Sequence, residues 1–274
     1  MTLTRVVLGI GVATAIAAAV LAPALAAEQS GTAVAVRQSA LATSEGAQRV
    51  LQSAGPVFAS DRINTGATGQ VQIQLLDQTK LVVGPNSSMV IDQFVFAGNG
   101  TANKVAINVT KGAFRFITGL SPKKAYSITT PTATIGVRGT QLDVSYVNGV
   151  TNFALFEGGA RVCDQRNRCV DFSQRCEAAI IPAQNDMQRL SPGSATTRYL
   201  AAHFPYIASQ TNLLPAYRVD TAGCGYTGGD AGGNSSDGHG STAAPSPSSD
   251  GGEGGDGGEG GGSDSGGSDG GGDL

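Results

Sequence analysis

The sequence predicts an all-β fold, and three observations support this class. Residues 70–75 alternate strictly between glutamines and the apolar Val71, Ile73 and Leu75, which is the period of two that a half-buried strand shows. Short apolar pieces of this kind recur at intervals of roughly 8–12 residues. No segment before Cys176 carries a sustained helical period. About ten short strands are therefore expected to form a solenoid-like or sandwich-like stack.

The other predicted elements follow in chain order. We expect strands at residues 81–83, 89–91, 94–96, 105–109, 114–117, 126–128, 133–137, 142–147 and 151–156. Turn residues separate these strands, and Asn148-Gly149 between two apolar runs predicts a two-residue hairpin. The one predicted helix covers "TTRYLAAHF" at 196–204, with Thr196 or Thr197 as its N-cap and Pro205 as its end.

The N-terminus has the pattern of a secretory signal peptide. Arg5 precedes an apolar stretch, and Pro23 is followed by "ALA" at 24–26, where we expect cleavage. An uncleaved membrane anchor is the alternative, and Pro23 with the small-residue cleavage site argues against it. We therefore expect a periplasmic or secreted bacterial protein without stable membrane insertion after cleavage.

The C-terminus is rich in glycine and acid. From Gly225 onward the chain holds 21 of its 40 glycines and nine carboxylates, and it has no Lys or Arg. Such a composition buries too little apolar surface to offset its ordering entropy, so residues 227–274 are predicted to be disordered. The tail also lacks the regularly spaced apolar residue of a calcium-binding β-roll. The body from Glu28 to Cys224 carries 17 basic and 12 acidic residues, which are scattered, so nucleic acid is not an expected partner.

The four cysteines predict two disulfides, because their number is even and the chain is expected to be exported. Cys163 and Cys169 flank a five-residue polar turn, where facing hairpin positions suit a disulfide. Cys176 and Cys224 are then left to pair. Free buried thiols are the alternative, and a metal site is not expected because no Cys-x-x-Cys occurs.

The sequence offers little for catalysis. His203 is the one histidine of the body, and we expect a structural role for it. "SPKK" at 121–124 matches Ser-x-x-Lys formally, but it lies in a turn. Asp77, Asp92 and Asp143 come from distant strands, and turn or corner roles explain Asp77 and Asp143. We therefore expect no enzyme activity, no cofactor and no metal, with a hydrolase as the outside alternative.

The stretch "TPTATIGVRGTQLDV" at 130–144 predicts a corner. Ala133 to Val137 and Leu142 to Tyr146 each alternate, but the step from Val137 to Leu142 is odd, so a bulge or bend must lie at Arg138-Gly139. Gly139 can supply a positive φ there. We expect Arg138 to donate to free carbonyls at this bend or to pair with Asp143, with ligand binding as the less favoured alternative.

The same stretch also resembles a known family. "SDRINTG" at 60, "LLDQTKLVVGPNSSMVID" at 75, "KGAFRF" at 111, "TPTATIGVRGTQLDV" at 130 and "FEGGARV" at 156 resemble the FecR domain in order and spacing, over about residues 31–165. Leu142 stands where this family commonly has an aromatic residue. The resemblance implies an all-β, solenoid-like domain without catalytic residues, whose signature corner is Arg138, Gly139, Thr140 and Asp143.

Four regions are therefore expected. They are a signal peptide at 1–26, a FecR-like β domain at 27–175, a disulfide-linked segment at 176–226 and the acidic tail at 227–274. In the family's iron-dicitrate regulator this domain follows a cytoplasmic sigma-factor-binding segment, which this sequence is expected to lack. The first hypothesis is an exported scaffold or recognition module for a protein or a cell-envelope polymer. The second hypothesis is a sensing partner of a membrane regulator.

Overall fold

A computed structural model describes residues 28–226, so the predicted signal peptide and acidic tail lie outside the described residues. The described residues contain 17 strands, two short α-helices and three 3-10 turns. The predicted all-β class is confirmed. No helix within residues 28–226 has both the length and the apolar character that crossing a membrane requires.

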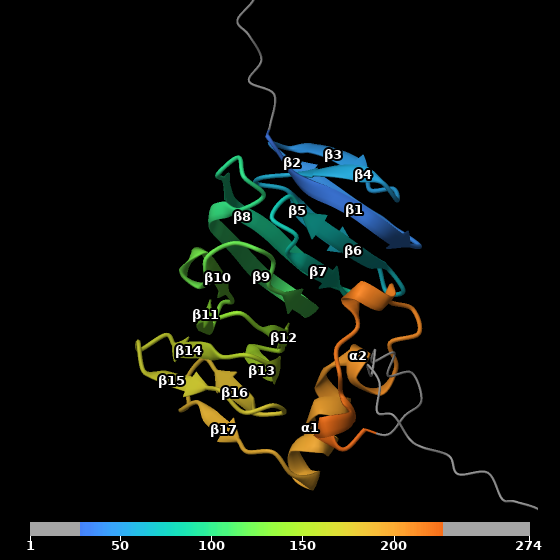
Figure 1. Cartoon of the computed structure of the whole chain (residues 1–274). Coiled ribbons are helices and arrows are strands. Elements are labelled where there is room, and N and C mark those ends of the chain that lie inside the picture. Colours follow the sequence, from blue (N-terminus) through green and yellow to red (C-terminus); the bar gives the residue numbers. More distant parts are fainter. Residues whose placement is uncertain (1–27, 227–274) are drawn as a thin grey trace, which may run out of the picture. The chain divides into compact units, whose positions relative to one another are not determined.

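The strands form two open sheets that face each other (Figure 1). The first sheet has, in spatial order, β4 (Gly55–Phe58), β1 (Gln29–Arg37), β6 (Gln70–Leu75), β7 (Lys80–Val83), the second half of β9 (Ala102–Ile117), β12 (Gln141–Val147), β13 (Val150–Glu157), β16 (Ala178–Pro182) and β17 (Gln188–Leu190). The second sheet has β3 (Ala47–Val50), β2 (Ala40–Ser44), β5 (Arg62–Thr65), β8 (Ser88–Phe96), the first half of β9, β10 (Tyr126–Thr129), β11 (Ala133–Val137), β14 (Ala160–Asp164) and β15 (Cys169–Phe172).

Strand β9 joins the two sheets, because its first half pairs with β8 and its second half with β7 and β12. The sequence predicted two strands here with a turn at Lys111-Gly112. The structure instead has one continuous strand that bends at Gly112, where φ is 91°. A Cβ at this position would lie 2.0 Å from the Oγ of Ser87, so only glycine allows β9 to approach the residue directly before β8 this closely.

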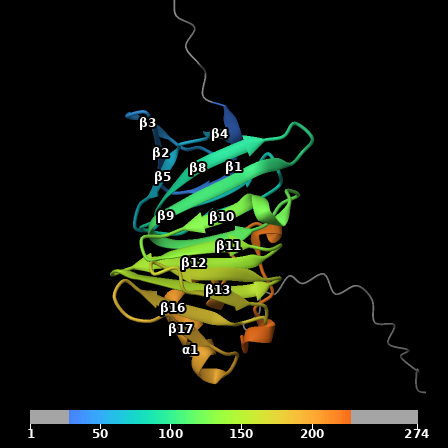
Figure 2. The same cartoon turned by 90° about the vertical axis from the view of Figure 1, so that its left-hand side faces the viewer.

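The main core lies between the sheets and consists of the inward-facing apolar residues of both. From β5 onward the chain adds strands to one sheet and then to the other, and each addition extends the stack in the same direction, whereas β3 and β4 lie at the opposite end (Figure 2). The two sheets pack as a sandwich, and the chain passes between them repeatedly, as in a solenoid. The sandwich continues past residue 175, because β16 and β17 extend the first sheet.

Residues 191–226, named here the C-terminal segment, cover the outer face of the first sheet, and they are coloured orange in Figure 1. The segment contains α1 (Ser194–His203), α2 (Pro205–Ala208) and two 3-10 turns, η2 (Pro215–Tyr217) and η3 (Ala222–Cys224). A third 3-10 turn, η1 (Lys123–Ala125), precedes β10. Leu200, Phe204 and Ile207 pack against Phe156 of β13 and form a second, smaller core.

This cover corrects the prediction that residues 70–75 are half-buried. Gln70 and Gln72 point away from the main core, yet both are buried. Their amide groups donate to the backbone oxygen of Asn212, at 3.3 and 3.2 Å, and the Gln72 amide oxygen accepts from the N–H of Leu214. A segment about 140 residues away in sequence therefore covers the polar face of β6.

The predicted helix exists, but its ends differ from the prediction. It begins at Ser194 with Gly193 as N-cap, and neither Thr196 nor Thr197 caps it. The Thr196 hydroxyl donates to the backbone oxygen of Ser191 at 2.6 Å. Pro205 ends α1 as predicted and also begins α2, because proline suits the first helical position, where no N–H partner is needed.

Candidate functional site

A groove of about 560 Å³ opens where β9 crosses between the sheets, beside the junction of α1 and α2. Gly112 and Ala113 of β9 contribute to its lining, and Gly112 is buried. Its apolar walls come from three different parts of the chain. They are Pro85 in the loop after β7, Tyr146 and Val147 at the end of β12, and Pro205.

Local sequence explains why this groove is open. The hairpin between β12 and β13 turns at Asn148 and Gly149, whose φ angles are 51° and 80°, as the predicted two-residue turn requires. Strand β12 therefore ends at the groove with Val147, whose surface is 49% exposed. Lys111, Asn86, Asn148 and His203 supply a polar rim around the apolar walls.

His203 lies at this rim as an exposed residue in the last turn of α1. Its ring stacks on the ring of Tyr199, with centroids 4.1 Å apart, and its Nδ1 lies 2.9 Å from the backbone oxygen of Tyr199. A carbonyl only accepts, so Nδ1 carries the proton in this contact. The contact has no nucleophile or carboxylate in it, in keeping with the structural role expected for His203.

A buried ion pair lies beneath the C-terminal segment. Arg115 of β9 and Asp143 of β12 occupy neighbouring strands, and the guanidinium donates to both carboxylate oxygens of Asp143, at 2.8 and 2.9 Å. Both side chains are buried. Burial raises the pKa of Asp143, and the charge and hydrogen bonds of Arg115 act in the opposite direction.

Arg115 also holds the C-terminal segment. Its guanidinium donates to the side-chain oxygen of Gln210 and contacts the backbone oxygens of Tyr206 and Tyr217, at 3.4 and 3.5 Å. It lies over the rings of Phe156 and Tyr206, at 5.6 and 5.5 Å from their centroids. The ion pair therefore connects the first sheet to the segment that covers it.

The signature corner is present, but its charges pair differently from the prediction. The chain passes from β11 in the second sheet to β12 in the first through Gly139, whose φ is 73°. Asp143 pairs with Arg115 and not with Arg138. Arg138 is 56% exposed and lies 3.8 Å from Asp171, while the N–H of Thr140 donates to the hydroxyl of Thr118 at 2.9 Å. The bend directs the Arg138 side chain outward, so it does not donate to the carbonyls of the corner.

The other carboxylates considered for catalysis lie in different surroundings. Asp77 is buried, and its carboxylate accepts from Thr79, Ser121 and Tyr126, at 2.6–3.1 Å. Ser121 of the "SPKK" stretch is thus a partner of Asp77 and not a nucleophile beside a lysine. Asp92 is exposed. Asp77 and Asp143 have separate sets of structural partners, which leaves no pair of carboxylates facing a common space.

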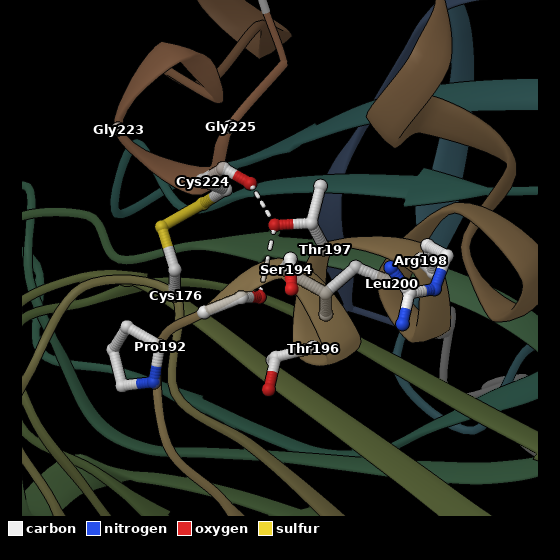
Figure 3. A pocket seen from close by; sticks show the side chains of 11 residues that line it. Cys176, Pro192, Ser194, Thr196, Thr197, Arg198, Leu200, Gly223, Cys224 and Gly225 are labelled. Carbon is white, nitrogen blue, oxygen red and sulfur yellow. Dashed lines mark hydrogen bonds between the residues drawn. A yellow bond between two sulfur atoms is a disulfide. The ribbon is translucent and has the colours of Figure 1, made fainter.

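A second pocket, of about 490 Å³, lies at the start of α1 (Figure 3). Its wall includes the disulfide between Cys176 and Cys224, named here the clamp disulfide, which joins the loop before β16 to the end of the C-terminal segment. The Thr197 hydroxyl lies 2.7 Å from the backbone oxygen of Cys224 and 3.1 Å from that of Gly193. This pocket is therefore part of the attachment of the C-terminal segment.

The predicted pairing of Cys163 with Cys169 is also present, and we name this bond the hairpin disulfide. It joins facing residues of β14 and β15. The described residues contain no free cysteine. The side chains of described His, Cys, Asp and Glu residues do not gather into a group of three that could hold a metal.

Sequence reasoning missed Arg115 and the groove. Arg115 lies in "GAFRFI", where alternation places it opposite Phe114 and Phe116, so its position on the outer face was predictable but its burial was not. The groove combines residues from four separate parts of the chain. Only Val147, an apolar residue at the end of an alternating strand and directly before the Asn148-Gly149 turn, gave a local signal.

Comparison with known proteins finds one family model that matches part of this chain. The family model described as "FecR protein" matches residues 61–161. Two crystal structures described as "a putative anti-sigma factor from Parabacteroides distasonis ATCC 8503" are similar, with TM-scores of 0.40 and 0.39 and identities of 15% and 14%. The first match covers 50% of this chain and 64% of that chain, which is less than two thirds of it, and the second covers 53% and 74%. No curated protein matches the chain.

Proposed function

This chain carries a FecR domain over residues 61–161, and from this premise we propose that it is an exported, non-enzymatic recognition module that binds another protein outside the cytoplasm. The groove between Pro85, Val147 and Pro205 is the proposed binding site. The observation that carries the proposal is that its walls are apolar while its rim is polar.

The lining favours a protein as the partner over a polysaccharide. Val147 and the neighbouring Tyr146 offer apolar surface, which an apolar side chain of a partner would bury favourably. A polyhydroxylated polymer would instead place hydroxyl groups against apolar walls, where they lose hydrogen bonds to water without gaining others. Flat aromatic platforms for sugar rings are also scarce, since the chain has no Trp.

Two features support export. Residues 1–26 have the order of charge, apolar stretch and small residues that signal peptides show. Both disulfides of the structure suit an oxidising compartment, because cytosolic reductants keep most thiols reduced.

The proposed absence of catalysis rests on the roles of the buried carboxylates. Asp61 accepts from Arg49 and from the N–H of Phe58, and Glu177 accepts from Arg189 and two backbone N–H groups. With Asp77 and Asp143, each of these acids binds groups of the fold itself. A general acid or base would need a carboxyl group that faces a substrate.

Binding can be tested with two matched variants. Val147 in the groove is 49% exposed, and Val95 of β8, away from the groove, is 48% exposed. Full-length protein with Val147→Glu should lose its partner from the native cell envelope at least about tenfold, since a buried unpaired charge costs more than 1.4 kcal/mol. Protein with Val95→Glu should retain the partner.

The outcomes separate the hypotheses. Equal retention by both variants would contradict the groove as the site. A protein partner would be contradicted if no protein is retained and the parent and the Val147→Glu variant sediment equally with isolated envelope polymer. A retained membrane regulator would favour the second hypothesis, a sensing role, whereas a retained structural envelope protein would favour a scaffold.

A further inference from the structure

The two disulfides lie in very different surroundings. The clamp disulfide is buried, since Cys176 is 3% and Cys224 is 4% exposed. In the hairpin disulfide, Cys169 is exposed and Cys163 is half-buried. Cys169 belongs to β15, which is the last strand of the second sheet and pairs only with β14 among residues 28–226. An external thiolate can therefore reach Cys169 much more easily than either sulfur of the clamp disulfide.

The outer face of the second sheet remains open at this disulfide. The C-terminal segment packs on the first sheet, against residues of β7, β9 and β13. The partners of Cys163 across the sheet are Thr134 of β11 on one side and Cys169 on the other. Thr134 is small and exposed, so it leaves the disulfide accessible from solvent.

Hydrogen bonds hold the turn between the two cysteines in addition to the disulfide. The Asp164 carboxylate accepts from the backbone N–H groups of Arg166 and Arg168, both at 2.9 Å, and from the Arg168 guanidinium. The backbone N–H of Asn167 also donates to the backbone oxygen of Asp164 at 3.0 Å. The turn should thus persist when the sulfur–sulfur bond opens.

The far end of the hairpin is held independently. Phe172 of β15 is buried, and its ring lies 5.0 Å from that of Phe153. Next to it, Asp171 pairs with Arg161 of β14. With the hairpin fixed at both ends, Cys163 and Cys169 remain opposite each other as thiols, so the bond can open and close without unfolding.

We propose that the hairpin disulfide is a thiol–disulfide exchange site that accepts electrons from an extracytoplasmic dithiol. A thiolate of the dithiol attacks the Sγ of Cys169 and forms a mixed disulfide, while the bond to Cys163 breaks and Cys163 leaves as a thiolate that takes a proton from water. The second thiol of the dithiol loses its proton and attacks the dithiol sulfur of the mixed disulfide, which breaks the bond to Cys169, and Cys169 leaves as a thiolate that takes up a proton. Two electrons pass to the protein, which ends with two thiols, and the dithiol becomes a disulfide.

Dithiothreitol titration of the oxidised full-length protein tests this site. After each step, free thiols are blocked with iodoacetamide and located by peptide mass spectrometry. Cys163 and Cys169 should be blocked at a dithiothreitol concentration at least about tenfold below that needed for Cys176 and Cys224. The protein reduced at this one bond should keep its far-ultraviolet circular dichroism and should close the bond again when the reductant is removed. Reduction of the clamp first, or of both bonds together with unfolding, would overturn the proposal.

Two variants make the result independent of overall stability. Protein with Cys176→Ser and Cys224→Ser retains only the hairpin disulfide, and its bond should open at the same dithiothreitol concentration as in the parent. A Cys163→Ser variant leaves Cys169 without its partner, so a small disulfide such as cystamine should form a stable mixed disulfide at Cys169. If Cys169 in the folded Cys163→Ser variant fails to react while the unfolded variant reacts, the sulfur is shielded and the proposal is wrong.

Discussion

Replacing Arg115 by Met should destabilise the protein by about 3–5 kcal/mol, the usual cost of removing one partner of a buried ion pair. Arg115 has no exposed side-chain surface, and its guanidinium makes two hydrogen bonds to Asp143. Methionine has a similar length and is apolar, so it fills most of the same space. The variant would therefore leave the carboxylate of Asp143 buried without its counter-charge.

The lost contacts extend to the C-terminal segment. Arg115 also contacts Gln210 and the backbone oxygens of Tyr206 and Tyr217. A domain of this size typically has a free energy of unfolding of about 5–15 kcal/mol, so the loss is a large fraction of the total. We expect the segment to exchange its amide hydrogens faster in the variant even where the sandwich remains folded.

Urea unfolding followed by circular dichroism measures this effect. The double variant Arg115→Met with Asp143→Leu removes both charges, and it should recover most of the lost free energy, since apolar replacements of a whole buried pair are often neutral. Arg161→Met serves as the control, because Arg161 forms an exposed ion pair with Asp171. This variant should unfold near the urea midpoint of the parent.

Two results would refute this reasoning. One is an Arg115→Met protein that unfolds within about 1 kcal/mol of the parent, which is the range of an exposed ion pair. The other is a double variant no more stable than the single one, because the cost would then come from lost packing and not from the unpaired carboxylate.

Four further predictions follow from the same contacts. Replacing both cysteines of the clamp disulfide by Ser should cost about 4 kcal/mol in urea unfolding, and the same change in the hairpin disulfide about 2 kcal/mol, because the clamp closes the longer loop; equal costs would contradict the chain-entropy explanation. Burial of Glu177 acts to raise its pKa, but hydrogen bonds from Gln174, Arg189 and Ser173 lower the pKa overall, so Glu177 stabilises the fold above its unfolded pKa and this stabilisation is lost as pH falls through the folded pKa. Glu177→Gln should therefore lose less stability than the parent as the pH is lowered, and equal losses of stability in the two proteins would count against this. Arg138→Ala should melt with the parent because the side chain is exposed, and a clear loss of stability would show a structural role. Intact-mass analysis of the exported protein should show a new N-terminus close to Ala27, and recovery of the full-length chain from membranes would argue for an uncleaved anchor.

Local patterns predicted the strands that alternate clearly and the turns with specific residues. Strand β11 was predicted with its observed bounds, and the Asn148-Gly149 hairpin and the bend at Gly139 are where the sequence indicated them. These features depend on neighbouring residues alone. Strands β1–β5 were missed, and so were β16 and β17, because these segments are short or lack a strict alternation of apolar and polar residues.

The remaining errors arise from contacts between distant parts of the chain. The face of β6 that carries Gln70 and Gln72 looks solvent-exposed in the sequence, but residues 212–214 cover it. The partner of Asp143 was expected at Arg138, five residues earlier, and is Arg115, 28 residues earlier. Register between strands decides such pairs, and sequence spacing does not reveal it.

The proposed role as a protein-recognition module is tested most directly by photo-crosslinking within the native cell envelope. A photoreactive residue placed at position 147 should yield one dominant crosslinked polypeptide, because Val147 lines the groove, and the same residue at position 95 should not yield it. An equal yield from both positions, or crosslinks at position 147 to envelope polysaccharide alone, would contradict the proposal.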